Sequence, residues 1–146
     1  MRCCSDIVGT MSHKNAPAPT SEAVTNHVRV EVLSRYSPDK SRPLQDEWVF
    51  QYTVRITNEG HDMVQLLTRH WIITDGMDHT EEVKGPGVVG EQPVLASGES
   101  FKYSSWCTLK TPTGVMRGTY QMVPAGGDQF DIEIAPFALK AHYTVH

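Results

Sequence analysis

The chain has few cysteines and no long apolar run. Only three of its 146 residues are cysteine, and Cys3 and Cys4 are adjacent near the N-terminus. An odd number with this spacing argues against a disulfide framework and favours a reducing compartment. No apolar run approaches the roughly 20 residues that cross a membrane, and the N-terminus lacks the apolar core of a secretory signal. We therefore expect a cytoplasmic protein with no membrane contact.

A strong charge of either sign is also missing. The formal net charge of -4 at pH 7 is too mild to suggest broad binding to nucleic acid. The length fits one domain with a substantial core. Because residues 12–23 are rich in Ser, Thr, Pro, Ala and Asn, we expect a disordered N-terminal tail over 1–23 and the folded domain over 24–146.

The folded part shows a period of two and no helical period. The clearest run, WVFQYTVRITN at Trp48–Asn58, alternates large apolar residues with polar ones. This pattern predicts an antiparallel strand with one buried and one wet face. Turn-forming residues at 58–61 separate it from VQLLTRHWIITD at Val64–Asp75. The two strands are therefore predicted to form a hairpin.

Other segments have strand character as well, and turn-forming residues separate them. They are Val28–Tyr36, an expected edge strand at His79–Lys84, Ser100–Leu109, Val115–Val123 and Phe130–Phe137. Seven or eight antiparallel strands without a helix predict an all-β fold, a β-sandwich of the immunoglobulin or fibronectin type III kind. The Cys…Trp…Cys signature of antibody domains is absent, which favours the fibronectin-like variety.

Several motifs resemble the ApaG family. They are QLLTRHWIITD (Gln65–Asp75), EEVKGPGVVGEQPVL (Glu81–Leu95), SGESFKYSS (Ser97–Ser105) and GTYQMV (Gly118–Val123). The resemblance covers essentially the whole expected domain and implies a fibronectin type III-like sandwich. Bacterial members often carry a cobalt/magnesium efflux label, and no catalytic residues are established for the family. In eukaryotes the same domain is fused to F-box proteins and to a polymerase-delta-interacting protein, which implies protein–protein recognition.

The motif EEVKGPGVVGEQPVL contains G-x-G-x-x-G at Gly85, Gly87 and Gly90. In a dinucleotide-binding loop a helix follows the glycines and holds the pyrophosphate at its N-terminus. Here Pro93 and Gly98 leave no room for such a helix. The pattern does not indicate a Rossmann site.

Two interpretations of the glycines remain. They could permit positive φ in a connection between sheets. Alternatively, their N–H groups could converge on a pyrophosphate-containing nucleotide, with Lys84 adding positive charge, as family descriptions also suggest. Because Glu81, Glu82 and Glu91 flank the loop and would repel an anion, the first interpretation is favoured.

The segment Arg69-His70-Trp71 offers a second candidate binding site. Arg69 could pair with a phosphate or carboxylate, and His70 titrates near neutral pH. The side chains of neighbouring strand residues point to opposite faces of the sheet. Arg69 and His70 can therefore bind one ligand together only if a β-bulge lies between them. We favour a structural interpretation in which His70 is packed or hydrogen-bonded, Arg69 pairs with an acid and Trp71 anchors the core.

Neither metal binding nor catalysis has a specific signature. The acidic stretch DGMDHTEE at 75–82 could hold a hard cation weakly through its oxygens, but no recognised ligand spacing occurs in the sequence. Cys107 has no local nucleophile motif, and the serines lack G-x-S-x-G. We therefore predict no metal site, no cofactor and no catalytic residues. An efflux pump would also need membrane spans, which the chain lacks.

The favoured prediction is a non-enzymatic protein-binding module that uses a sheet face or edge together with the Gly85–Gly90 loop. The aromatic residues at positions 36, 106, 120 and 137 leave room for a partner-binding face, a homo-oligomeric one included. The alternative is a sensor of pyrophosphate-containing nucleotides or divalent metal, and a hydrolase ranks third. The ligand-binding candidates are Lys84, Gly85, Gly87, Gly90 and Arg69.

Overall fold

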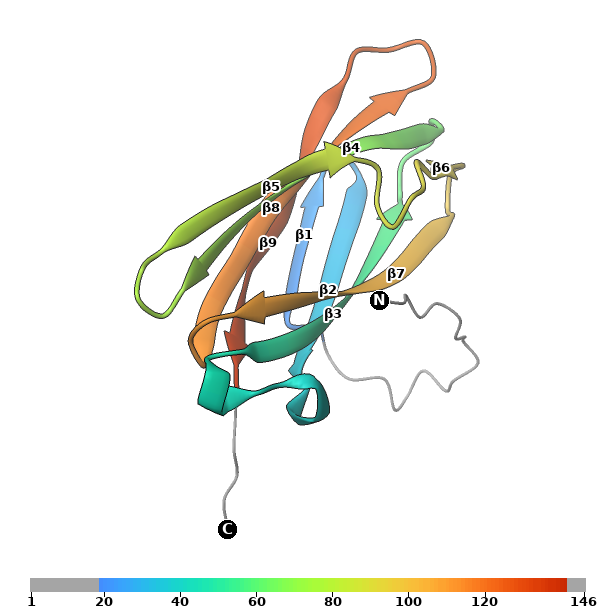
Figure 1. Ribbon diagram of the computed structural model, residues 1–146. Helices are drawn as coiled ribbons and strands as arrows, with labels where there is room; N and C mark the ends of the chain where they lie inside the picture. The colour runs from blue at the N-terminus through green and yellow to red at the C-terminus, as the bar shows by residue number, and fades with distance from the viewer. Residues whose placement is uncertain (1–18, 142–146) are drawn as a thin grey trace, which may run out of the picture.

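Two antiparallel sheets face one another across an apolar core in the computed structural model, which describes residues 19–141 (Figure 1). The first sheet has the order β1-β2-β3-β7 and the second the order β5-β4-β8-β9, with the short β6 beside β4. The strands are β1 (Ser21–Thr25), β2 (Val28–Tyr36), β3 (Trp48–Asn58), β4 (Val64–Asp75), β5 (Thr80–Pro86), β6 (Val94–Leu95), β7 (Ser100–Leu109), β8 (Thr113–Pro124) and β9 (Phe130–Lys140). The predicted all-β sandwich is confirmed.

The folded domain begins before residue 24, the start predicted from the sequence. Ser21–Thr25 forms β1 and pairs with β2 in the register Ser21↔Val32 to Thr25↔Val28. Residues 21–23 therefore belong to the sandwich, because the free edge of β2 offers backbone partners that composition cannot reveal. The remainder of the expected tail, 1–18, lies outside the described residues, as does 142–146.

The hairpin predicted between β3 and β4 is wrong. β3 pairs with β2 and β7 in the first sheet, whereas β4 pairs with β5, β6 and β8 in the second. The connection at 59–63 crosses from one sheet to the other. Both strands bury an apolar face, and here those faces pack against each other across the core instead of lying in one sheet.

The core is built from the alternating inward residues of both sheets. Phe50, Val54 and Ile56 of β3 and Leu66 of β4 are fully buried, as the period of two predicted. Burying each such side chain contributes about 1.5–3 kcal/mol to the free energy of unfolding. Trp71 is only 2% exposed, which confirms its predicted place in the core.

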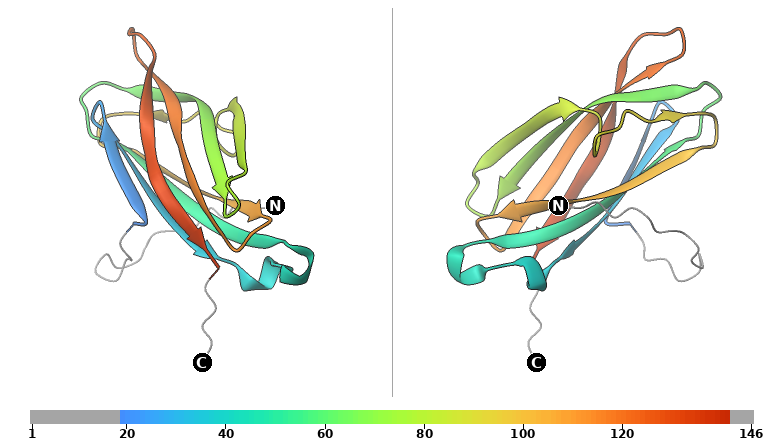
Figure 2. Two further views of the ribbon diagram at one scale, coloured as in Figure 1. Left: turned by 90° about the vertical axis from the view of Figure 1, so that its left-hand side faces the viewer. Right: turned by 45° about the vertical axis from the view of Figure 1, so that its right-hand side comes forward.

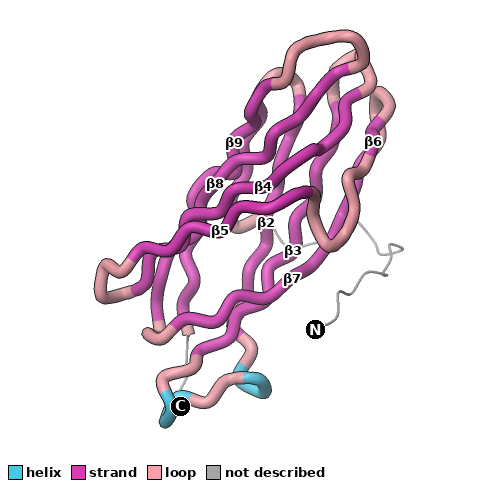
Figure 3. The backbone as a smooth tube through the Cα atoms, turned by 45° about the horizontal axis from the view of Figure 1, so that its top comes forward, coloured by secondary structure: helices cyan, strands magenta, loops and turns pink. Residues whose placement is uncertain are grey.

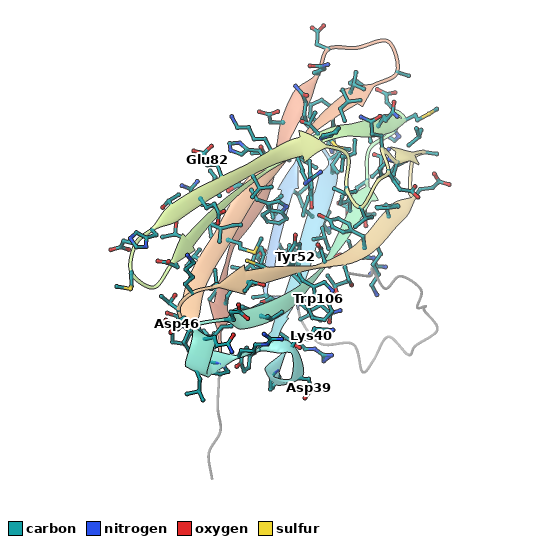
Figure 4. All side chains as sticks on the ribbon, viewed as in Figure 1. Asp39, Lys40, Asp46, Tyr52, Glu82 and Trp106 are labelled. Atoms are coloured by element: carbon teal, nitrogen blue, oxygen red, sulfur yellow. The ribbon has the colours of Figure 1, made fainter. Side chains whose placement is uncertain are left out.

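The four aromatic residues considered for a surface patch divide between core and surface. Tyr120 and Phe137 are buried, and Tyr36 packs against the core beside Phe50. Trp106 faces outward on β7, where Lys40 Nζ lies 5.0 Å from its ring centroid (Figure 4). Lys40 ends the 3-10 turn η2 (Pro38–Lys40), and a second turn, η3 (Pro43–Gln45), follows before β3. Together these residues form no single exposed aromatic face.

The two sides of the sandwich differ. On one side β1 and β2 pack against β9, as the views in Figure 2 show. On the other side β5 and β7 are the outer strands of their sheets (Figure 3). Every residue of β5 except Gly85 is exposed, including those that face the core side of the sheet. This side of the molecule holds the candidate site.

Candidate functional site

The glycine loop after β5 is a tight turn closed by its own backbone. Val88 and Glu91 exchange two N–H···O=C bonds of 2.8 Å each. Between them Val89 has φ 42° and Gly90 φ 81°, and positive φ at both central positions is typical of a type I′ turn. Gly87 has φ 62°, and a β-carbon there would lie 2.3 Å from the Glu91 carbonyl oxygen. The favoured interpretation, positive φ, is confirmed at Gly87 and Gly90 and is wrong for Gly85. The loop also joins β5 to β6 within the second sheet and does not connect the two sheets.

Gly85 has a different task, because it lies in β5 opposite Arg69. A β-carbon on Gly85 would come within 3.0 Å of the Arg69 guanidinium. That guanidinium crosses over β5, and its Nη1 donates to the carbonyl oxygens of Pro86 and Gly87 at 3.0 Å each. Arg69 therefore supports the glycine loop through backbone carbonyls. The expected acidic partner is not found: Arg69 forms no ion pair with any residue from 19 to 141.

The loop has few N–H groups left for an anion. The amide of Gly87 donates to the Leu67 carbonyl oxygen at 2.8 Å, and those of Val88 and Glu91 bond each other's carbonyls. Within the turn this leaves the amides of Val89 and Gly90 without a bond to the described residues. Two adjacent amides make a smaller anion cradle than the convergent set that a nest provides.

Lys84 and Arg69 lie on opposite faces of the second sheet. Lys84 pairs in register with His70, one position away from the Arg69–Gly85 pair, and adjacent strand residues alternate between faces. Lys84 nevertheless borders an open hollow of about 500 Å³ whose lining also includes Arg69 and Gly85, beside Thr119 and Gln121. Of the five predicted ligand-binding residues, Lys84, Arg69 and Gly85 thus contribute to one hollow, and Gly87 and Gly90 do not line it.

His70 is hydrogen-bonded, as the favoured interpretation predicted. Its Nε2 lies 2.8 Å from Glu82 Oε1 on the outer face. The bulge in β4 occurs between Leu66 and Thr68, before Arg69, so it does not bring Arg69 and His70 to the same face.

The acidic turn after β4 is held by hydrogen bonds between the Asp75 carboxylate and the backbone of the turn. Asp75 Oδ1 accepts the N–H groups of His79 and Met77 at 3.0 and 2.8 Å. These bonds, the His79 one foremost, lower the pKa of the Asp75 carboxyl. In the part of the chain that the structure describes, no three His, Cys, Asp or Glu side chains are placed to hold a metal ion. Nor does that part contain a helix long and apolar enough to cross a membrane.

Cys107 is a buried residue of β7, and burial raises the pKa of its thiol to about 12, with a smaller contribution from the Glu81 carboxylate. A thiol with such a pKa is almost entirely protonated at neutral pH and is a poor nucleophile.

Comparison with known proteins identifies the chain's relatives. The sequence model of the ApaG domain matches residues 38–124. The chain belongs to the ApaG domain family. Protein ApaG of Bordetella pertussis (strain Tohama I) is 53% identical over 117 residues, which cover 80% of this chain and 89% of that protein. Protein ApaG of Anaeromyxobacter sp. (strain K) is 53% identical over 126 residues, covering 86% of this chain and 99% of the relative.

Solved structures support the same assignment. The crystal structure of a Bordetella pertussis protein described as ApaA has a TM-score of 0.77 at 48% identity, and the match covers 88% of this chain and all of the other. A second X-ray structure, a structural genomics target, gives a TM-score of 0.76 at 41% identity over 85% of this chain and 99% of the target. The sandwich of this ApaG-family chain is therefore the fold of experimentally determined relatives.

The ApaG sequence motifs did not reveal the exposed inner side of β5. In register, Glu81 lies opposite Ile73 and Val83 opposite Trp71, and both partners contribute to the core. Glu81 and Val83 nevertheless remain exposed, Val83 by 36%. We call Glu81, Val83, Gly85 and the Arg69 guanidinium the open border. Its only signal in the sequence is that TEEVKG has a single apolar residue where a covered strand would have a stripe.

Proposed function

We propose that this ApaG-family chain is a non-enzymatic binding module of the cytoplasm that recognises another protein at the open border and the adjoining glycine loop. The observation that carries the proposal is the exposure of every β5 residue except Gly85, the inward-facing Glu81 and Val83 included. An outer strand presents N–H and C=O groups that have no partner in its own sheet. An extended segment of another protein can use these groups to extend the sheet.

The apolar surface beside β5 supports this location. Val83 of β5 and Val89 of the glycine loop that follows it are both exposed apolar residues. Val89 also has positive φ, which is strained for a β-branched residue.

The candidate nucleophiles have structural contacts, which supports a non-enzymatic role. The Ser100 hydroxyl lies 2.8 Å from Thr57 Oγ1, and the Ser104 hydroxyl lies 2.7 Å from Thr53 Oγ1. Both pairs join β3 to β7 across the outer face of the first sheet. These two hydrogen-bonded pairs and the protonated thiol of Cys107 support a structural role for the three side chains and not a role as nucleophiles.

Photo-crosslinking in cells tests the proposal. A benzophenone amino acid is placed at Val83 or Val89, with the fully exposed Leu44 of η3 as the control position. We expect the same discrete protein adduct from Val83 and Val89 and none from Leu44. An adduct of twice the chain mass would assign the site to a second copy. If Val83 and Val89 give no adduct that Leu44 lacks, the proposal is wrong.

A further inference from the structure

One end of the open border carries a positive charge, that of Arg69, without a counter-ion in the described part of the chain. Nη1 of Arg69 is occupied by two carbonyl oxygens, whereas its Nε and Nη2 have no bond to any residue from 19 to 141. A guanidinium has five N–H donors in a planar fork that fits a carboxylate. Burial raises the pKa values of Tyr52 and Tyr103, and the positive charge of Arg69 opposes this rise. Arg69 is two positions before the buried Trp71 in β4, so its side chain lies on the core side of the sheet.

The residue in front of Arg69 leaves the guanidinium accessible from the edge. Gly85 has no side chain, and the guanidinium lies directly over its α-carbon. A strand added beside β5 would run about 4.8 Å away. Its side chain opposite Gly85 would therefore meet the unused donors of Arg69. Next in the border, the indole N–H of Trp71 is buried and has no acceptor among the described residues.

The other end of the open border is acidic. Glu81 faces the same side of β5 as Val83 and Gly85, and its charge acts on Cys107 of β7. Gly85 lies four positions after Glu81, which corresponds to about 13 Å along a strand. Val83 lies midway and is apolar. The open border thus has a positive group at Gly85, where Arg69 crosses, an apolar side chain at Val83 and a negative side chain at Glu81.

We infer that the partner is an extended segment that pairs antiparallel with β5 and carries an acidic, an apolar and a basic side chain at alternate positions. The order from its N-terminus is acidic-x-apolar-x-basic, because an antiparallel strand meets Gly85 before Glu81. The acidic group binds Arg69, the apolar group packs on Val83 and the basic group pairs with Glu81. The inference rests on the proposed function and specifies the chemistry of its partner.

A charge-swap experiment tests this arrangement. The probe is a fluorescent peptide, Ser-Thr-Glu-Thr-Val-Thr-Lys-Thr-Ser, and its counterpart has Glu in place of Lys. Fluorescence anisotropy gives the Kd of each peptide for the wild-type protein, Glu81→Lys and the control Glu82→Lys, whose side chain lies on the outer face beside His70. Both substituted side chains are exposed, so all three proteins should have similar unfolding midpoints.

We expect the wild-type protein to bind the Lys peptide about tenfold more tightly than its counterpart. Glu81→Lys should reverse this preference, and Glu82→Lys should leave it unchanged. The inference is overturned if the Lys peptide shows no saturable binding up to about 1 mM, or if the preference is the same in all three proteins. It is also overturned if Glu81→Lys changes the sedimentation of the protein alone, because the border then holds a second copy.

The two proposals fail separately. If crosslinks form at Val83 and Val89 but the charge swap fails, the protein-binding function stands and the charge pattern is wrong. If neither experiment gives a positive result, the proposed function itself is wrong.

Discussion

Single glycines of the loop have different structural tasks. Gly87 combines positive φ with a neighbouring carbonyl oxygen that occupies the place of a β-carbon, whereas Gly90 has positive φ but no atom within 4 Å of that place. Gly85 makes room for Arg69. The same sequence pattern therefore reflects a backbone clash, a turn conformation and a side-chain contact.

We predict that Gly87→Ala lowers the free energy of unfolding by at least about 3 kcal/mol, since strain and a clash with Glu91 add together. Gly90→Ala, the matched control, should cost about 1–2 kcal/mol for the left-handed conformation alone. Urea unfolding of both variants measures the difference. Equal losses would contradict the assignment of the clash to Gly87.

The connection between β3 and β4 is the element that decides the topology, and one residue organises it. Asn58, at the end of β3, is 1% exposed. Its Nδ2 donates to the carbonyl oxygens of Asp62 at 2.8 Å and Leu95 at 3.0 Å, and its Oδ1 accepts the Gly60 N–H at 2.9 Å. These bonds hold the chain as it leaves the first sheet and link it to the residues around β6.

We predict that Asn58→Ala lowers the free energy of unfolding by about 2–4 kcal/mol, because it leaves buried backbone groups without partners. Asn58→Asp should not restore stability, since a carboxylate cannot donate to the two carbonyl oxygens. Thr57→Ala removes only an exposed bond to Ser100 and should cost about 0.5 kcal/mol. Chemical denaturation measures all three, and a stable Asn58→Ala variant would show that the connection does not need these bonds.

For the whole molecule, the two competing functions predict different responses to ligands. A ligand at about 100 times its Kd raises the free energy of unfolding by roughly 2.7 kcal/mol. Because three amides of the glycine loop are already bonded and Lys84 lies on the other face from Arg69, we predict no change in the unfolding midpoint with pyrophosphate or diadenosine tetraphosphate. Thermal unfolding checks this. A rise in the midpoint that Lys84→Ala abolishes would favour the nucleotide sensor instead.

Local patterns predicted most of the fold. Local sequence patterns identified seven of the strands, and alternation in segments such as Trp48–Asn58 also identified the buried face. The edge position of β5 was predicted as well. The short β1 and β6 were missed, because five or two residues contain too little alternation to detect. The candidate site was predicted in part: the need for positive φ at Gly87 and Gly90 followed from residue type, but the contacts of Arg69 did not.

The sequence by itself determined which of the longer segments are strands, where alternation makes one face apolar and to which family the chain belongs, because alternation and motif identity are properties of neighbouring residues. Only the tertiary structure decided that β3 and β4 lie in different sheets, that the inner face of β5 stays exposed and that Arg69 has no acidic partner among residues 19–141. Strand pairing is settled by competition among all the strands for the same edges. The open border exists because the second sheet extends to β5 on a side where β7 does not cover it.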